Sequence, residues 1–228
     1  MATVNYATNL SQRTPCVLVL DASLSMETKE SGGQTRINLL NEGIKAFHQA
    51  LQEDEVALSR VQVAAICVGG PSEGAEMLMD WTDATEFQPF PLVAGGNTPL
   101  GAGIRLALET IENQKTKLRT YGISYTRPWI FVLTDGQPTD RRDIWQAACS
   151  EAREAEVADK VEIFPIGVGQ ADIKKLAEIS KRTPIMMDSV RFRELFVWLS
   201  ASLGQISRSV PGDKVELPPT DPWAAVKL

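Results

Sequence analysis

Residues 16–25 have the sequence Cys-Val-Leu-Val-Leu-Asp-Ala-Ser-Leu-Ser, an apolar run that ends at a carboxylate and continues into alternating hydroxyls. The apolar part is short and rich in valine, which is typical of a strand covered on both faces. Comparable runs occur at 61–68, 129–133 and 161–168, although Pro165 is unusual for a central strand. These runs predict a sheet built from buried strands.

Helical periodicity separates the apolar runs. Apolar residues recur three and four positions apart from Ile37 to Leu51 and again over 192–206. A further helix is expected from Thr98, with the threonine as cap and Pro99 in the first helical position. Strands that alternate with helices predict an α/β fold, namely a doubly wound, mostly parallel sheet with helices on both faces.

Shorter elements complete this prediction. One short antiparallel edge strand is expected at 77–81, and a short last strand at 185–187. We also expect a helix capped by Asp140, with Ile144, Ala148 and Ala155 facing inward, and a short helix around 173–177.

The length of 228 residues suits a single domain with extensions. We expect an N-terminal extension over 1–14, the domain over 15–209, and a proline-rich tail over 210–228. The tail has no hydrophobic periodicity, so it is expected either to lie over the surface or to be disordered.

Composition excludes several classes of protein. With 43% hydrophobic and 23% charged residues the chain can form a core, and its net charge of −6 argues against nucleic-acid binding. No apolar run reaches the roughly 20 residues of a membrane span, and the first residues do not resemble a signal peptide. Cys16, Cys67 and Cys149 are odd in number and far apart, which favours buried free thiols, a reducing compartment and a cytoplasmic protein.

Three polar segments are expected at one edge of the sheet, because ligands of open parallel sheets bind at the carboxyl ends of the strands. Asp21, Ser23 and Ser25 follow the first strand, and their spacing of two places them on one side if the chain stays extended. Thr98 stands at a helix start, and Asp135 follows the strand at 129–133. These five oxygen ligands favour Mg²⁺ most, with Mn²⁺ or Ca²⁺ as alternatives, over zinc.

These motifs resemble the metal-ion-dependent adhesion site (MIDAS) of von Willebrand factor A domains, in which D-x-S-x-S, a later Thr and an Asp in T-D-G form the site. All five positions are filled here. The resemblance implies a Rossmann-like fold, a metal at the sheet edge, and a partner protein whose Asp or Glu completes the coordination. Leu24 stands where Gly is common in that family.

A narrower resemblance covers residues 12 to 208. The stretches R-T-P-C-V-L-V-L-D, E-F-Q-P-F-P-L, G-G-N-T-P-L-G and L-T-D-G-Q-P-T-D are similar to bacterial TerY/YegL-type proteins. That family is associated with tellurite resistance and stress, and is often encoded beside a Ser/Thr kinase and a protein phosphatase. It therefore implies a signalling or scaffolding role.

The leading hypothesis is a non-enzymatic, metal-dependent protein-binding module with no catalytic residues. His48, the only histidine, lies mid-helix and is not expected to be a general base. Two alternatives stay open: a metal-dependent phosphoester hydrolase with Asp140 or Glu27 as base, and a structural subunit with a vestigial site. Self-association is a further hypothesis, with Asp213, Glu216 or Asp221 of the tail occupying another molecule's metal site.

Overall fold

The computed structural model describes residues 11–187, 191–209, 215–220 and 224–225. Within these residues seven strands form one sheet in the order β3-β2-β1-β4-β5-β6-β7. The strands are β1 (Thr14–Ala22), β2 (Val61–Gly69), β3 (Gly74–Asp83), β4 (Trp129–Thr134), β5 (Glu162–Val168), β6 (Ile185–Met187) and β7 (Ala224–Ala225).

Four of the six strand pairs are parallel, while β3 runs antiparallel to β2 and β7 antiparallel to β6. The mostly parallel sheet is confirmed. The expected antiparallel edge strand is β3, which is longer than the predicted 77–81. The second antiparallel strand, β7, was not predicted, because two alanines after a proline-rich stretch carry no strand pattern.

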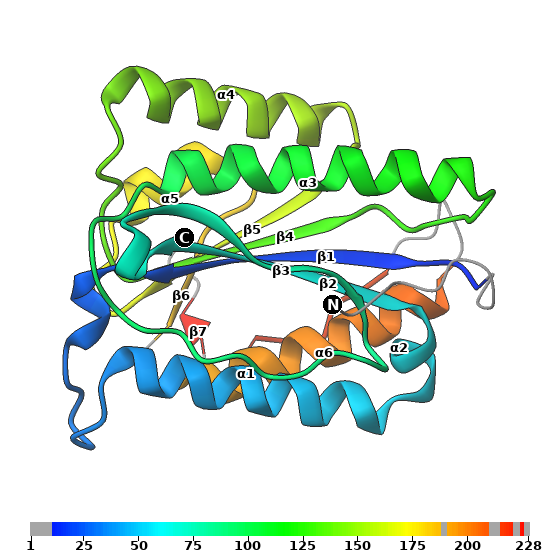
Figure 1. Cartoon of the computed structure of the whole chain (residues 1–228), viewed down its shortest axis with the longest axis horizontal. Helices are drawn as coiled ribbons and strands as arrows, with labels where there is room; N and C mark the ends of the chain where they lie inside the picture. The colour runs from blue at the N-terminus through cyan, green and yellow to red at the C-terminus, as the bar shows by residue number, and fades with distance from the viewer. Residues whose placement is uncertain (1–10, 188–190, 210–214, 221–223, 226–228) are drawn as a thin grey trace.

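Helices cover both faces of the sheet. They are α1 (Arg36–Glu53), α2 (Glu55–Arg60), α3 (Leu100–Thr120), α4 (Arg142–Val157), α5 (Ile173–Ile179) and α6 (Phe192–Arg208), and two 3₁₀ turns, η1 (Leu24–Glu27) and η2 (Gly70–Ser72), follow β1 and β2. Helices α3, α4 and α5 lie on one face, and α1, α2 and α6 lie on the other (Figure 1). The predicted doubly wound architecture is therefore confirmed.

Alternation along β1 explains why this strand is apolar throughout. Cys16, Leu18 and Leu20 point into the core beneath α1 and α6, while Val17 and Val19 point into the core beneath α3 and α4. Every residue of the strand is buried. A strand in the middle of a sheet covered on both faces has no solvent side on which to place a polar residue.

Two details differ from the sequence prediction or refine it. Ile144 is 37% exposed, whereas Trp145 is buried, since the indole occupies the inward position and donates to Glu178 over 2.5 Å. Ala148 is buried as predicted. Pro165 is tolerated because β6 pairs only with Ile166 to Val168, so β5 has a single paired neighbour at the proline.

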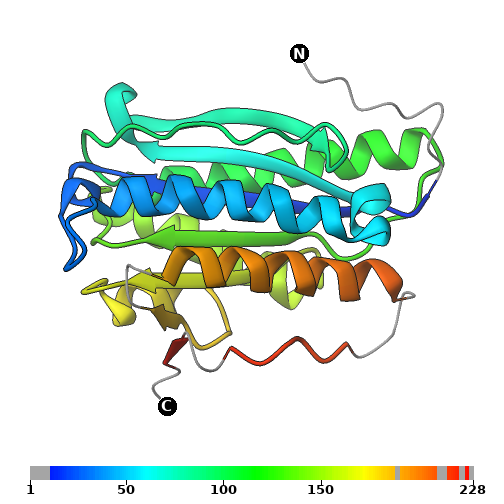
Figure 2. The ribbon, with the colours of Figure 1, turned by 90° about the horizontal axis from the view of Figure 1, so that it is seen from below.

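The C-terminal segment 215–220 runs alongside α6, on the side away from α1 (Figure 2), and β7 pairs with β6 at the edge of the sheet. The indole Nε1 of Trp198 donates to the carbonyl oxygen of Pro218 at 2.7 Å, and Leu217 packs against the core. The tail therefore lies over the surface where it is described. Asp213 and Asp221 lie outside the described residues.

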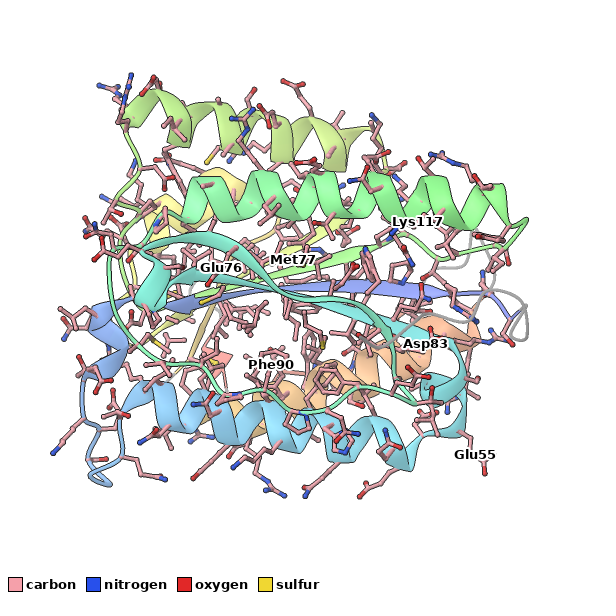
Figure 3. The ribbon with its side chains drawn as sticks, viewed as in Figure 1. Glu55, Glu76, Met77, Asp83, Phe90 and Lys117 are labelled. Carbon is pink, nitrogen blue, oxygen red and sulfur yellow. The ribbon has the colours of Figure 1, made fainter. Side chains whose placement is uncertain are left out.

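The long segment between β3 and α3 crosses the α1 side of the sheet. Its Phe90 lies between the sheet and α1 (Figure 3) and contacts Phe87 edge to face at 6.3 Å. His48 of α1 is half-buried and its ring centroid lies 6.0 Å from that of Phe87. All three cysteines are buried free thiols, as predicted. Among the described helices, none has the length and apolarity needed to cross a membrane.

Candidate metal centre

The candidate site lies where the strand order reverses. Strand β1 lies between β2 and β4 in the sheet. The loop after β1 leads to α1 on one face of the sheet, and the loop after β4 leads to α4 on the other face (Figure 1). Leu20 pairs with Leu133, so Asp21 and Asp135 both lie at the carboxyl ends of these neighbouring strands. Such a switch point is the usual ligand position in an open parallel sheet.

A chain of hydrogen bonds connects four of the predicted ligands. The hydroxyl oxygens of Ser23 and Ser25 are 3.0 Å apart, and Ser25 Oγ donates to Asp135 Oδ1 at 2.6 Å. The backbone N–H of Ser23 donates to Asp21 Oδ1 at 2.8 Å. Residues that are far apart in sequence, such as Ser25 and Asp135, are thus brought within direct contact.

The loop after β1 reaches this arrangement by a route that the sequence analysis did not predict. The strand ends at Ala22, and η1 begins at Leu24, so the chain does not stay extended through Ser25. Met26 is fully buried, and its N–H donates to the carbonyl of Ser23 at 3.0 Å. Burial of Met26 curls the loop inward, and the tight turn brings the serine hydroxyls together.

Thr98 is positioned by a second loop rather than by a capping role. The residue before α3 is Pro99, and no side chain of its own segment caps the helix, so the prediction of Thr98 as N-cap is wrong. Asp140 accepts from the N–H groups of Gly101 at 2.9 Å and Ala102 at 3.2 Å instead. Asp140 was predicted to cap its own helix, but α4 begins after Arg141 with no side-chain cap.

The two loops hold each other through two hydrogen bonds between Thr98 and Thr139. Thr98 N–H donates to Thr139 Oγ1 at 3.0 Å, and Thr139 N–H donates to the Thr98 carbonyl at 2.9 Å. A β-carbon built on Gly136 would lie 3.7 Å from both Ser25 Oγ and Thr98 Oγ1. The hydroxyl of Thr98 therefore faces the same space as Ser25, and within the described residues it forms no hydrogen bond.

Asp21 is fully buried between its donors. Thr134 Oγ1 donates to Asp21 Oδ2, and the backbone N–H of Ser23 donates to Asp21 Oδ1. Burial raises the pKa of Asp21 to about 6, although the hydrogen bonds from Ser23 and Thr134 act in the opposite direction. A cation beside this carboxyl would favour its charged form and offset the cost of burial.

Asp135 is neutralised by a residue that the sequence analysis missed. Arg36 Nη1 donates to Asp135 Oδ2 at 2.7 Å, and Arg36 Nε donates to Glu30 at 2.7 Å. Burial lowers the pKa of Arg36, but the hydrogen bonds and charges of Asp135 and Glu30 together outweigh this effect, so the pKa lies above its ordinary value. No motif marks Arg36, because its partner is 99 positions away in the chain.

The residues present fit a hard divalent cation. Asp21, Ser23, Thr98 and Asp135 are buried while Ser25 is exposed, so the cluster of oxygens opens to solvent on one side. The described residues contain no cluster of three or more His, Cys, Asp or Glu side chains suited to a metal. The predicted ligand set has only two carboxylates, so any ion here relies on hydroxyls, which suits Mg²⁺ or Mn²⁺.

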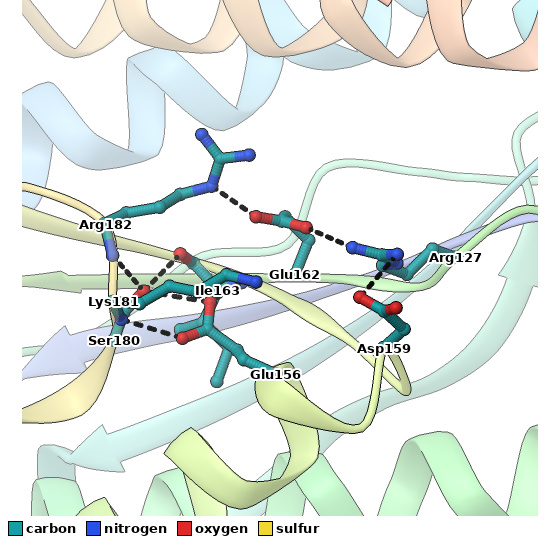
Figure 4. Close-up of polar contacts among 8 residues, drawn as sticks. All are labelled: Arg127, Glu156, Asp159, Glu162, Ile163, Ser180, Lys181 and Arg182. Carbon is teal, nitrogen blue, oxygen red and sulfur yellow. Dashed lines mark hydrogen bonds and ion pairs between the residues drawn. The ribbon is translucent and has the colours of Figure 1, made fainter. Parts of the chain in front are cut away.

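A second cluster of acids serves the structure instead. Glu156, fully buried, accepts from Ile163 N–H, Ser180 Oγ and Lys181 N–H (Figure 4). Glu162 accepts from Arg127 at 2.9 Å and from Arg182 at 2.5 Å. Glu162 is the first residue of β5, whereas Asp21 lies at the carboxyl end of β1. This cluster therefore lies at the opposite end of the parallel strands from Asp21. These carboxylates are satisfied by the chain itself.

A doubly wound α/β domain with an oxygen-lined site at its switch point is the class that this fold and site define. The chain belongs to the von Willebrand factor type A domain family, whose family model matches residues 16–195. Domains of this family are generally non-enzymatic adhesion or scaffold modules. No match was found among curated protein sequences.

Solved structures support the fold. The pilus adhesin SpaC from Lactobacillus rhamnosus GG, in an open conformation, superposes with a TM-score of 0.66 at 16% identity, over 86% of this chain and 31% of that chain. The vWF domain of the type V pili tip protein Mfa5 from Porphyromonas gingivalis superposes with a TM-score of 0.61 at 11% identity, over 88% of this chain and 98% of that chain.

A third similar structure is proximal thread matrix protein 1 from the mussel byssus with a zinc-occupied MIDAS motif. It gives a TM-score of 0.56 at 15% identity, over 86% of this chain and 48% of that chain. This chain therefore spans about half of the mussel protein and about a third of SpaC. At these identities the likeness concerns the fold alone.

Proposed function

We propose that this protein is a metal-ion-dependent protein-binding module. One divalent cation would be held by Asp21, Ser23, Ser25, Thr98 and Asp135, and an Asp or Glu of a partner protein would complete its coordination. Family membership supports a protein-interaction role. The contacts between Ser23, Ser25 and Asp135 support a shared site for the ligands.

The observation that carries the proposal is the position of Thr98. A threonine directly before a helix ordinarily caps it, but Pro99 stands between Thr98 and α3. Asp140 caps α3 from another loop instead, and the Thr98 hydroxyl faces the same space as Ser25 Oγ without a hydrogen bond among the described residues. A hydroxyl placed in this way is available as a metal ligand.

Each residue has a distinct task in this proposal. The hydroxyls of Ser23, Ser25 and Thr98 would supply neutral oxygens, and Asp21 and Asp135 would supply the charge. Asp21 and Asp135 would balance the charge of a divalent ion, and the other three ligands are neutral hydroxyls. An open coordination position would then accept the carboxylate of a partner. Leu24, 65% exposed beside Ser25, would offer an apolar contact to the residue next to that carboxylate.

Calorimetric titration tests the proposal. Mg²⁺, Mn²⁺ and Zn²⁺ are titrated into the wild type and into Ser23→Ala and Asp135→Ala, with Ser150→Ala as control because Ser150 is exposed on α4. We expect one ion per chain in the wild type and the control, and at least tenfold weaker binding in the two site variants. Equal binding in all four proteins would remove the basis of the proposal.

A short peptide with a single glutamate tests the partner chemistry. It should bind the ion-loaded wild type, and binding should vanish in chelator and in Ser23→Ala. If the peptide binds equally with and without metal, carboxylate coordination is the wrong mechanism.

Finer proposals follow from the resemblance to TerY/YegL-type proteins. We propose Mg²⁺ as the natural ion, a cytoplasmic protein, and a signalling or scaffold role in a bacterial stress or tellurite-resistance system with a Ser/Thr kinase or protein phosphatase as partner. The domain is proposed to span 15–209, with an extension over 1–14 and a tail over 210–228. The tail's acidic residues, including exposed Glu216, would allow self-association.

The alternative functions gain no specific support. Asp140, one of two proposed bases for a hydrolase, has both carboxylate oxygens engaged by backbone N–H groups of α3. The other, Glu27, is exposed in η1. A vestigial site would be expected to have lost ligands, yet all five positions are filled.

A further inference from the structure

We infer that Arg36 is a built-in counter-cation of the metal site, which holds Asp135 while no ion is bound and sets how tightly an ion binds. This inference rests on the proposed metal site and assigns a role to a residue outside its five ligands.

The geometry places the guanidinium in direct competition with an ion. Asp135 has a fully buried side chain, and both of its oxygens are engaged, Oδ1 by Ser25 Oγ and Oδ2 by Arg36 Nη1. Arg36 itself is only 14% exposed, so solvent screens this pair less than a surface pair. A buried carboxylate without a cation would be costly, and Arg36 supplies that cation from within the chain.

An incoming divalent ion meets this positive charge across a single carboxylate. Its attraction to Asp135 is partly cancelled by repulsion from the guanidinium. Glu30 offsets part of the guanidinium charge, so we expect a net effect on the order of tenfold in affinity. Arg36 therefore lowers the affinity for the ion while it stabilises the metal-free protein. The two effects have opposite signs for the same side chain.

Glu30 gives the guanidinium a second partner. It accepts from Arg36 Nε at 2.7 Å, and it belongs to a loop closed by hydrogen bonds from Glu30 N–H to Gln34 O and from Gly33 N–H to Glu30 O. When an ion takes over the charge of Asp135, Arg36 keeps its bond to Glu30. Glu30 thereby favours the ion-bound state, whereas Asp135 alone would draw Arg36 toward the site.

The test measures affinity and stability on the same variants. Arg36→Gln keeps a long polar side chain without the charge, and Arg36→Lys keeps the charge. We expect Mn²⁺ to bind Arg36→Gln about tenfold more tightly than wild type by calorimetry, and Arg36→Lys to stay within about threefold of wild type. In chelator, Arg36→Gln should melt at a lower temperature than wild type, and saturating Mn²⁺ should close most of that gap.

Two further variants sharpen the outcome. Arg105→Gln removes an arginine from an exposed ion pair with Glu151 that includes none of the five candidate ligands, and should change neither affinity nor metal dependence. Glu30→Gln should weaken Mn²⁺ binding. If Arg36→Gln binds Mn²⁺ as wild type does, or more weakly, Arg36 is not a counter-cation. Absence of Mn²⁺ binding in every protein would instead refute the metal site itself, and this inference with it.

Discussion

Replacing Asp140 by alanine tests whether one carboxylate supports both α3 and the candidate site. Asp140 accepts from Gly101 N–H at 2.9 Å and from Ala102 N–H at 3.2 Å, so the variant leaves two N-terminal amides of a 21-residue helix without their partner. Loss of an N-cap carboxylate costs about 1 kcal/mol, and loss of a negative charge at the helix dipole costs up to about 1 kcal/mol more.

The expected total is about 1–2 kcal/mol, which corresponds to a fall in Tm of about 3–6 °C for a domain of this size. A second effect is expected at the site, because Thr139, next to Asp140, is bonded in both directions to the backbone of Thr98. Loosening that loop should weaken Mg²⁺ or Mn²⁺ binding several-fold without removing any ligand.

Urea denaturation and calorimetry, run on the same preparations, measure the two effects. Asp140→Asn retains an N-cap acceptor and should recover most of the stability. Asp143→Ala serves as the matched control, since Asp143 is 65% exposed and pairs only with exposed Arg141 among the described residues. An Asp140→Ala protein within about 0.3 kcal/mol of wild type would show that water satisfies these amides equally well, and the capping argument would fail.

Two further predictions concern regions outside the site. Ending the chain at Ser209 removes the segment that covers Trp198 and the strand that pairs with β6, so the variant should melt earlier and self-associate with rising concentration in sedimentation; a stable monomer would contradict this. Burial raises the pKa of Asp54, but bonds from Ala57 N–H and Arg208 hold it below its ordinary value, so its contribution to stability is present at neutral pH and lost as pH falls through that lowered pKa. The stability gap between wild type and Asp54→Asn should therefore shrink on acidification in urea titrations, and a constant gap would count against it.

The sequence predicted the central fold because burial on both faces leaves a strong pattern. Cys16 to Leu20 alternates between two cores, and any polar residue there would be buried without a partner. Elements at the edges left weaker patterns. Strand β7 consists of Ala224 and Ala225, which form a strand only because β6 offers an unpaired edge. Such pairing depends on tertiary contact and cannot be found in the local sequence.

The candidate ligands were predictable because their oxygens follow strand ends in a recognisable order, whereas their supports were not. Asp140 stands two positions before the first residue of α4 and was expected to cap that helix, yet its oxygens bond to α3, 38 and 39 positions earlier in the chain. Local propensity describes how a residue suits its own segment. It does not show which of two converging helix ends is nearer once the sheet has formed.

The same reasoning explains why the five ligands alone would not define the behaviour of the site. Asp140 caps α3, so the Thr98 hydroxyl is not used as a cap and faces the same space as Ser25 Oγ. Arg36 supplies the charge that lets Asp135 stay buried without an ion. Asp140 thus leaves the hydroxyl of Thr98 available to a metal ion, whereas Arg36 weakens the attraction of Asp135 for the ion. Two domains with identical ligand motifs but different residues at positions 36 and 140 should therefore differ in metal affinity. As single variants, Arg36→Gln should raise the affinity for the ion and Asp140→Ala should lower it. Arg36 contacts Asp135, whereas Asp140 contacts the start of α3, so their effects on metal affinity should be close to additive. A strongly non-additive double variant would show that the loop after β4, which carries both Asp135 and Asp140, couples the two contacts.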